Sequence, residues 1–292
     1  MLPRRTLFGI SVTPYAASYA ALVEQVRAAE RGGLDLVGIQ DHPYQRRFLD
    51  TFALIADLLA RTERLHVFPD VASLPFRPPT LLAKTAASLD VMSGGRFELG
   101  MGAGAFWDAV AGMGGPRRGA GESIDALEEA VRIVRAALDG ERVVRAPGPH
   151  YPVPGYPPGP PPAHRVEIWL GVYRPRGLAL AGRLADGWVP SLGRTGIEAL
   201  RRAAARLDEA ALAAGRDPRD VRRILNVSGT ITDGSVGEDA LDGPPALWVE
   251  RLAGLARDPG VDAFIFWPPD EGTVQVERFA AEVAPAVLAA LG

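Results

Sequence analysis

The sequence contains no cysteine, which excludes disulfide bonds, thiolate catalysis and cysteine-based metal sites. It also lacks an apolar run long enough to cross a membrane, so no membrane-spanning helix is expected. The first residues show no apolar signal core followed by a small-residue cleavage site. A cytoplasmic protein is therefore expected.

Charge and histidine spacing exclude further classes. The formal net charge of −3 gives no overall attraction to nucleic acid or to anionic membranes. Lys84 is the only lysine of the chain. The four histidines show neither the His-x-His nor the His-Glu-x-x-His spacing, so no metal site is expected.

What the chain does contain is a regular alternation of short apolar runs and helical segments. The runs are apolar throughout, which is typical of strands covered on both faces. The expected strands are Leu7–Val12, Leu36–Ile39, Leu65–Val71, Arg96–Met101, Val166–Val172, Trp188–Pro190, Arg223–Ile231 and Val261–Trp267. The expected helices are Tyr19–Arg31, Thr51–Arg61, Thr80–Met92, Ile124–Leu138, one beginning at Leu178, Ile197–Ala214, Pro245–Arg257 and Val274–Leu291.

This alternation predicts parallel strands joined by right-handed crossovers. Eight units in 292 residues fit a single-domain α/β chain folded as a (β/α)8 TIM barrel, with a doubly wound open sheet as the alternative. Nine prolines between Pro147 and Pro162 exclude regular structure there, so a proline-rich excursion or lid is expected before the fifth strand.

In a barrel, the active site lies at the carboxyl ends of the strands. The second strand ends in Asp41 and His42, followed closely by Tyr44. A histidine at this place donates a hydrogen bond or moves a proton near neutral pH, and we expect Asp41 to orient it. The alternative is a turn cap fixed by Asp41.

Glycines follow the fourth strand at every second position. Gly100, Gly102 and Gly104 therefore share one face of the strand, and a flat ring could lie where side chains are missing. The alternative is a taper in barrel packing. Phe106 and Trp107 come directly afterwards and are expected to wall the pocket.

The loop after the fifth strand has the character of a phosphate site. It begins at Gly171, continues through Val172 and Tyr173, carries Arg174 and Arg176, and ends at Gly177 before a helix-forming segment. Such a loop offers free backbone N–H groups and the positive end of a helix dipole, and arginines add charge-assisted contacts. An ordinary strand-to-helix turn with solvated arginines remains open.

Together these motifs resemble the bacterial luciferase-like family of flavin- and deazaflavin-dependent oxidoreductases. The resemblance runs from about Leu7 to Val287. The matching segments are Asp41-His42, Leu89-Asp90 with Ser93–Phe97 leading into Leu99–Gly104, Ile168–Gly171, Leu180–Trp188 and Gly215–Pro218.

The resemblance implies a barrel that holds FMN or coenzyme F420 over the strand ends, with the cofactor phosphate on the Gly171–Gly177 loop. It also implies a non-proline cis peptide at the end of the third strand, which here would join Asp70 to Val71. Similar deazaflavin dehydrogenases place a histidine where His42 stands, which favours F420 over FMN. They place a glutamate where this chain has Ala105, so we expect a different proton source and a more apolar pocket.

The expected activity is hydride transfer or monooxygenation of a small organic substrate. His42 and Asp41 are the expected catalytic residues, and the excursion together with the loop 233–243 is expected to cover the pocket. A homodimer is compatible with the alanine- and leucine-rich helices. Two alternatives remain: a sugar-phosphate isomerase or lyase, which would need a central base that Lys84 on a helix does not supply, and a non-catalytic flavin-binding barrel, suggested by Ala105.

Overall fold

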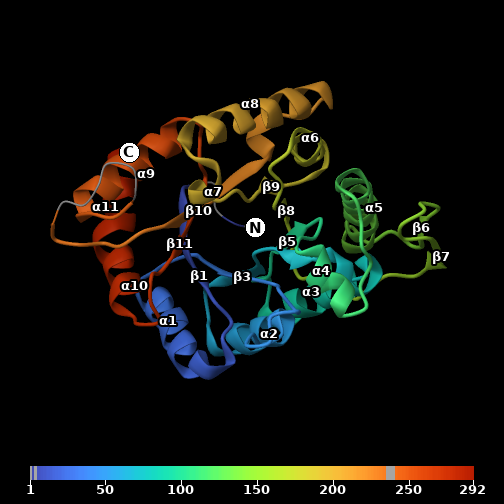
Figure 1. Cartoon of the computed structure of the whole chain (residues 1–292), viewed down its shortest axis with the longest axis horizontal. Coiled ribbons are helices and arrows are strands. Elements are labelled where there is room, and N and C mark those ends of the chain that lie inside the picture. The colour runs from blue at the N-terminus through green and yellow to red at the C-terminus, as the bar shows by residue number, and fades with distance from the viewer. Residues whose placement is uncertain (1, 3–4, 235–240) are drawn as a thin grey trace.

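The computed structural model describes residue 2 and residues 5–234 and 241–292. A ring of strands lies at its centre and helices surround the ring (Figure 1). The strands of the ring are β1 (Leu7–Val12), β2 (Leu36–Ile39), β3 (His66–Pro69), β4 (Ala72–Ser73), β5 (Leu99–Gly102), β8 (Ile168–Leu170), β9 (Gly187–Trp188), β10 (Arg222–Ser228) and β11 (Ala263–Trp267).

Strands β3 and β4 are two parts of one barrel strand. The sheet runs in the order β3, β2, β1, β11, β10, β9, β8, β5, β4, and the pairs are parallel. β4 pairs with β5, and Val67 of β3 bridges Phe97 just before β5. Since both parts lie beside the same neighbour, the ring closes with eight strand positions. The chain is a (β/α)8 TIM barrel, and the open-sheet alternative is wrong.

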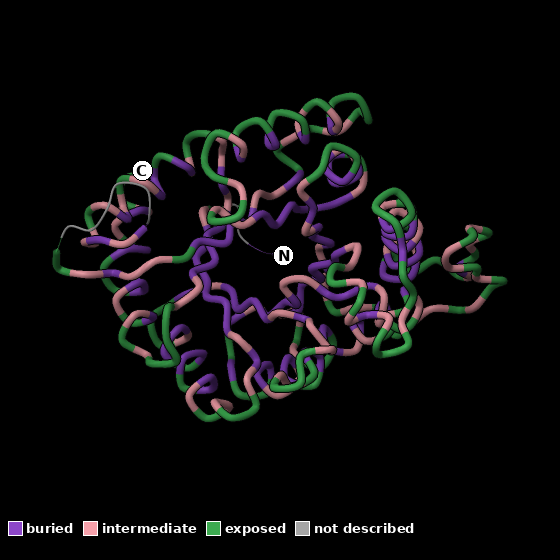
Figure 2. The backbone as a smooth tube through the Cα atoms, in the orientation of Figure 1, coloured by how far each residue is buried: buried purple, intermediate pink, exposed green. Residues whose placement is uncertain are grey.

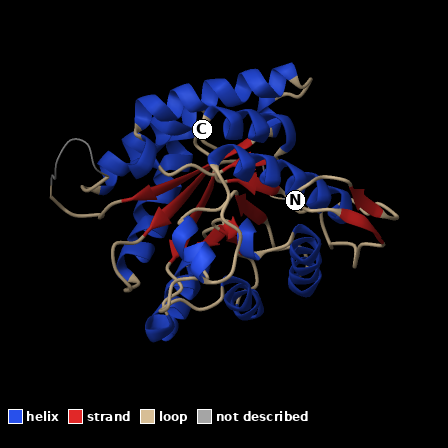
Figure 3. Ribbon diagram, turned by 45° about the vertical axis from the view of Figure 1, so that its right-hand side comes forward, coloured by secondary structure: helices blue, strands red, loops and turns tan. Residues whose placement is uncertain are grey.

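The helices cover the outside of the ring (Figure 3). They are α1 (Tyr19–Arg31), α2 (Thr51–Arg61), α3 (Pro79–Ser93), α4 (Trp107–Gly112), α5 (Ala120–Leu138), α6 (Pro175–Leu184), α7 (Leu192–Thr195), α8 (Ile197–Ala213), α9 (Pro245–Arg257), α10 (Val274–Arg278) and α11 (Ala284–Leu291). A π-helical segment, Phe279–Val283, joins the last two, so the expected final helix is interrupted. No helix in the described part of the chain is long and apolar enough to cross a membrane.

Two helix boundaries illustrate how local sequence sets these elements. The Asp50 carboxylate accepts hydrogen bonds from the backbone N–H groups of Phe52 and Ala53, both 3.0 Å long, and so caps the start of α2. Gly94, with φ of 68°, takes the left-handed conformation that ends α3. Both signals are local, and the sequence placed both boundaries within one residue.

Buried residues follow the ring of strands and the inner faces of the helices (Figure 2). Inside the ring, Leu7, Leu36, Phe68, Trp169 and other apolar residues form a separate core cluster. Side chains alternate along a strand, so Ile224 on β10 and Ile265 on β11 belong to this inner cluster while their neighbours pack against the helices. The next inward positions toward the carboxyl ends carry polar groups, and the site is built there.

The proline-rich excursion differs from expectation in two ways. It contains a strand, β7 (Val153–Tyr156), which pairs antiparallel with β6 (Val144–Ala146), so regular structure is present despite the prolines. Figure 1 shows this hairpin outside the ring, beyond α5. Lys84 of α3 donates a 2.8 Å hydrogen bond to the carbonyl of Gly159. The excursion packs on the flank of the barrel and does not line the pocket described below. Most of the other expected cover, residues 235–240 of the loop 233–243, lies outside the described residues.

Candidate functional site

A pocket of about 380 Å³ opens at the carboxyl ends of the barrel strands. Residues from the ends of β2, β4, β5, β8, β10 and β11 line it, so the barrel topology brings them together. Ten of the residues predicted from sequence line this pocket: Asp41, His42, Tyr44, Asp70, Val71, Gly102, Gly104, Phe106, Gly171 and Tyr173.

The pocket floor is formed where β3 gives way to β4. The peptide bond between Asp70 and Val71 is cis, which confirms the expectation drawn from the family resemblance. The interruption separates the two halves of the barrel strand and places both side chains at the mouth.

The glycines of the fourth and fifth barrel strands make room for this bulge. A Cβ atom on Gly102 would lie 2.7 Å from the Val71 side chain, and one on Gly171 would lie 2.8 Å from it. The space that the sequence suggested for a flat ring at these positions is therefore filled by Val71. Gly104 serves another purpose: with φ of 101°, it packs closely against Pro75 and Trp107.

Asp70 is the most unusual titratable group of the pocket. Its Oδ1 accepts a 3.3 Å hydrogen bond from the Asn226 amide, whose own oxygen accepts a 2.8 Å bond from the Trp267 indole. The residue lies partly exposed at the pocket, but its Oδ2 is inaccessible to solvent and has no hydrogen-bond partner among the described residues. Burial raises the pKa of Asp70 to about 7, against a smaller opposing effect of Asn226. The carboxyl group therefore changes charge near neutral pH.

Three aromatic rings stand together on one side of the mouth. His42 Nδ1 and the Tyr44 hydroxyl share a hydrogen bond of 2.7 Å. The centroid of the Phe106 ring lies 5.8 Å from that of His42 and 5.9 Å from that of Tyr44. Phe106 as a residue is 66% exposed. Burial lowers the pKa of His42, against the charge of Asp41, and it raises the pKa of Tyr44 to about 12. Both groups are thus neutral at pH 7.

The role expected for Asp41 needs correction. Its carboxylate is buried, accepts hydrogen bonds of 2.8 and 3.1 Å from Arg77, and accepts the backbone N–H of Ser73 at 2.8 Å. Tyr44, not Asp41, is the hydrogen-bond partner of His42. Asp41 therefore ties the end of β2 to β4 and supports the pocket wall.

The predicted phosphate loop reaches the pocket only in part. Gly171 and Tyr173 line it, whereas Val172 is buried in the core against Gly177. Arg176 donates a 2.6 Å hydrogen bond to Asp125 of α5 and so turns away from the mouth. Its neighbour at the start of α6, Arg174, is exposed and does not line the pocket. Trp107 likewise lies behind Gly104 instead of in the lining.

Sequence reasoning missed Arg194, the only arginine or lysine among the described residues that line the pocket. Arg194 comes from α7, and its Cζ lies 4.6 Å from the centroid of the Tyr173 ring. It forms no salt bridge within the described part of the chain. Tyr173 in turn donates a 3.2 Å hydrogen bond to Ser191. The run Ser191-Leu-Gly-Arg at a strand end was the available signal, and Asn226, a polar residue in an apolar strand, was another.

A second cavity of similar volume lies at the amino-terminal end of the barrel. Arg165, Asp186 and Arg222 are among its lining residues. Arg165 donates a 2.7 Å hydrogen bond to Asp186, and Arg222 contacts Glu167 at 3.3 Å. These pairs place opposite charges beside one another in the lining of this cavity.

His164, which looks like a surface group in the sequence, is also held at this end of the barrel. Its ring contacts Asp90 through Nδ1 at 2.7 Å and Glu98 through Nε2 at 3.0 Å. Burial alone would lower the pKa of His164, but the two carboxylates outweigh it and raise the pKa to about 9.

Comparison with known proteins agrees with the fold and shows the family. The sequence profile described as luciferase-like monooxygenase matches residues 5–257. An F420-dependent glucose-6-phosphate dehydrogenase of Microbacterium testaceum is 32% identical over 206 residues, which cover 68% of this chain and 60% of that enzyme. The match thus spans about three-fifths of that relative's length.

Solved structures share the fold at low sequence identity. The coenzyme F420-dependent tetrahydromethanopterin reductase from Methanopyrus kandleri superimposes with a TM-score of 0.83 at 18% identity, covering 96% of this chain and 99% of that one. A monooxygenase from Streptomyces bottropensis gives 0.79 at 21% identity, covering 96% and 99%. These likenesses establish the barrel architecture.

Proposed function

This chain belongs to the luciferase-like monooxygenase family, and from that premise we propose that it is an oxidoreductase that uses coenzyme F420 for hydride transfer to or from a small organic substrate. The alternative within the family is an FMN-dependent enzyme. Two lines support F420: the relative from Microbacterium testaceum bears that cofactor in its name, and His42 stands at the mouth where the F420 branch places a histidine.

The pocket fits a ligand with a flat, polar ring and an anionic tail. Its floor is the bulge at Val71 and its walls are the rings of Tyr44 and Phe106. Arg194 lines the same pocket and has no acidic partner among residues 5–234 and 241–292. Arg194 stands over Tyr173, close in sequence to the amino terminus of α6, where backbone N–H groups are unpaired. This unpaired cation beside a helix amino terminus is the observation that carries the proposal.

When bound, the deazaflavin or flavin supplies the hydride chemistry. A substrate that gives up a hydride must also give up a proton, and Asp70 is the pocket carboxyl that no cation pairs among the described residues. We propose that the Asp70 carboxylate accepts the proton that the substrate loses together with the hydride. Neutral His42, held by Tyr44, donates a hydrogen bond to the ligand or accepts one from it. The aromatic rings of the pocket wall exclude water.

Titration with each cofactor tests this assignment. The purified protein is titrated with F420 and, separately, with FMN, and binding is followed by absorbance and fluorescence. We expect one F420 per chain, bound more tightly than FMN. Tight FMN binding without F420 binding would reverse the cofactor assignment, and binding of neither would refute the proposal.

A further inference from the structure

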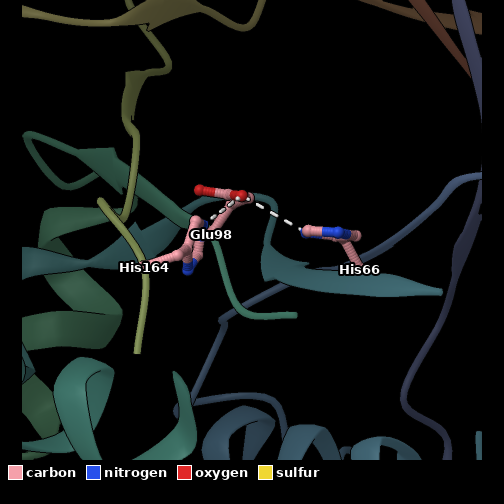
Figure 4. Close-up of side chains that lie close together, drawn as sticks. All are labelled: His66, Glu98 and His164. Atoms are coloured by element: carbon pink, nitrogen blue, oxygen red, sulfur yellow. Dashed lines mark hydrogen bonds and ion pairs between the residues drawn. The ribbon is translucent and has the colours of Figure 1, made fainter. Parts of the chain in front are cut away.

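Three residues far apart in the sequence meet at the amino-terminal end of the barrel, opposite the pocket. His66 is the first residue of β3, Glu98 directly precedes β5, and His164 lies in the segment that leads to β8. Figure 4 shows both imidazole rings turned toward Glu98. One nitrogen of each ring and one carboxylate oxygen all lie within 4.8 Å of one another.

The distances suit coordination of a common ion. Glu98 Oε1 lies 3.3 Å from His66 Nδ1 and 3.0 Å from His164 Nε2. Nitrogen and oxygen ligands bind zinc at about 2.0–2.2 Å, so two ligands of a tetrahedral ion lie roughly 3.3 Å apart. The two distances to Glu98 are close to this value, and all three atoms lie within 4.8 Å of one another.

His66 supplies a second, independent observation. Its Nδ1 is inaccessible to solvent and has no aligned hydrogen-bond partner among the residues that the structure describes, although it lies 3.3 Å from Glu98 Oε1. A buried imidazole nitrogen without a hydrogen bond is costly, because it has lost water and gained nothing in return. A cation between the three groups would satisfy it.

The surroundings of His164 are those of a metal ligand held by an outer carboxylate. Asp90 contacts His164 Nδ1 at 2.7 Å and accepts its backbone N–H at 3.0 Å, which fixes the ring and leaves Nε2 facing Glu98. A carboxylate behind a ligating histidine sets the tautomer and strengthens the ligand. The other oxygen of Glu98 is held in the same way by the backbone N–H of Glu167 at 2.7 Å.

We propose that His66, Glu98 and His164 bind one divalent transition-metal ion, of the zinc type, at the amino-terminal end of the barrel. Two imidazoles and one carboxylate suit zinc better than magnesium or calcium, which prefer oxygen ligands. With Asp90 alongside, a divalent ion balances two carboxylates, and it replaces the proton that His164 otherwise carries at neutral pH, which is released to solvent on binding. The ion would join β3, β5 and the segment before β8, so its role is to stabilise the barrel and it is independent of the cofactor site.

Zinc titration of the chelator-treated protein tests the site. We expect one zinc per chain by calorimetry, and a higher melting temperature when zinc is present. His66→Ala removes a ring whose Nδ1 has no hydrogen bond to the described part of the chain, so this variant should fold, and its zinc affinity should fall by about 10-fold or more. Glu98→Gln should weaken zinc binding as well.

His150→Ala is the matched control, because His150 lies in the proline-rich excursion. Its backbone N–H donates a 3.0 Å hydrogen bond to Glu129, which the substitution leaves in place, and its ring forms no hydrogen bond with the described residues. It should bind zinc as the parent does. Cobalt(II) gives a second readout, since its visible absorption reports tetrahedral coordination and should be absent in His66→Ala. The proposal is overturned if the parent binds no zinc at high micromolar concentration, or if His66→Ala binds zinc as tightly and with the same stoichiometry.

Discussion

At the scale of single residues, His42 and its hydrogen bond to Tyr44 carry the clearest expectation. His42→Ala should lower kcat/KM by about 10-fold to 100-fold, because a hydrogen bond to the ligand at the reacting end is lost. The dissociation constant of the cofactor should change little. Steady-state kinetics and cofactor titration check the two halves of this prediction.

Tyr44→Phe is the companion variant, since it removes only the hydroxyl that holds the His42 ring. It should lower kcat/KM in the same direction but less. Unchanged turnover in His42→Ala would show that the histidine has only a structural role.

The raised pKa of Asp70 has a consequence for stability. An unfolded aspartate titrates at its ordinary value of 3.8, whereas the folded group titrates at about 7. The folded state therefore binds more protons between these values, and Asp70 makes the protein less stable as pH rises through that window. Asp70→Asn keeps the acceptor for Asn226, and it should be more stable than the parent above pH 7 by up to about 4 kcal/mol.

Chemical denaturation of both proteins at pH 4 and pH 8 measures this difference. The advantage of Asp70→Asn should be present at pH 8 and nearly absent at pH 4. The same variant should lose most of its turnover, and with it the pH dependence near 7, because an amide cannot accept the proton assigned to Asp70. An equal stability difference at both pH values would contradict the assigned pKa.

At the scale of elements, the glycines beside the bulge determine how β3, β5 and β8 fit together. Gly171→Ala would place a Cβ 2.8 Å from Val71, so it should destabilise the protein by about 1–3 kcal/mol. Gly254→Ala is the control, because this exposed helical glycine has open space around it, and alanine there should stabilise by roughly 0.5–1 kcal/mol.

Combining Gly171→Ala with Val71→Ala tests whether contact between the new Cβ and the Val71 side chain causes the loss of stability. Removing the Val71 methyl groups opens the space that the new Cβ needs, so the two substitutions together should cost less than their sum. Urea denaturation of the four proteins gives the coupling free energy. Strict additivity would mean that the bulge does not press on Gly171.

Because α7 approaches the loop before α6, we expect Arg194 to contact the anionic part of the ligand. Arg194→Gln should weaken cofactor binding by about 10-fold, the loss expected for a charge-assisted contact. Arg174→Gln and Arg176→Gln should change it little, since the first is exposed and the second pairs with Asp125. Fluorescence titration ranks the three variants, and a larger loss in Arg176→Gln would restore the sequence-based assignment.

At the scale of the whole molecule, closure of the ring predicts cooperative unfolding. β3 and β4 share a neighbour, β5, so no strand edge divides the barrel into halves. We expect one thermal transition by circular dichroism and calorimetry. A saturating cofactor should raise its midpoint, because a ligand that binds only the folded state stabilises it by about 2.7 kcal/mol at 100 times its dissociation constant. Two separable transitions would contradict a single folding unit.

The sequence by itself determined the order and kind of the elements. Local signals were sufficient for β1, α1, β2 and α2, whose bounds agree with those expected from apolar runs, caps and terminal glycines. Eight repeated units also predicted the barrel, and the barrel placed His42 at its mouth. These properties depend on neighbours in the chain, which is why a linear reading can find them.

Only the tertiary structure decided which side chains meet. Asp70 and Asn226 are 156 positions apart, and the sequence around neither residue predicts the hydrogen bond between their side chains. The same holds for Val71 in the glycine gap, for Arg194 in place of Arg176, and for His66 beside Glu98. Hydrophobic periodicity tells which face of an element is buried, but the partner on that face depends on strand register and ring closure, which are properties of the assembled barrel.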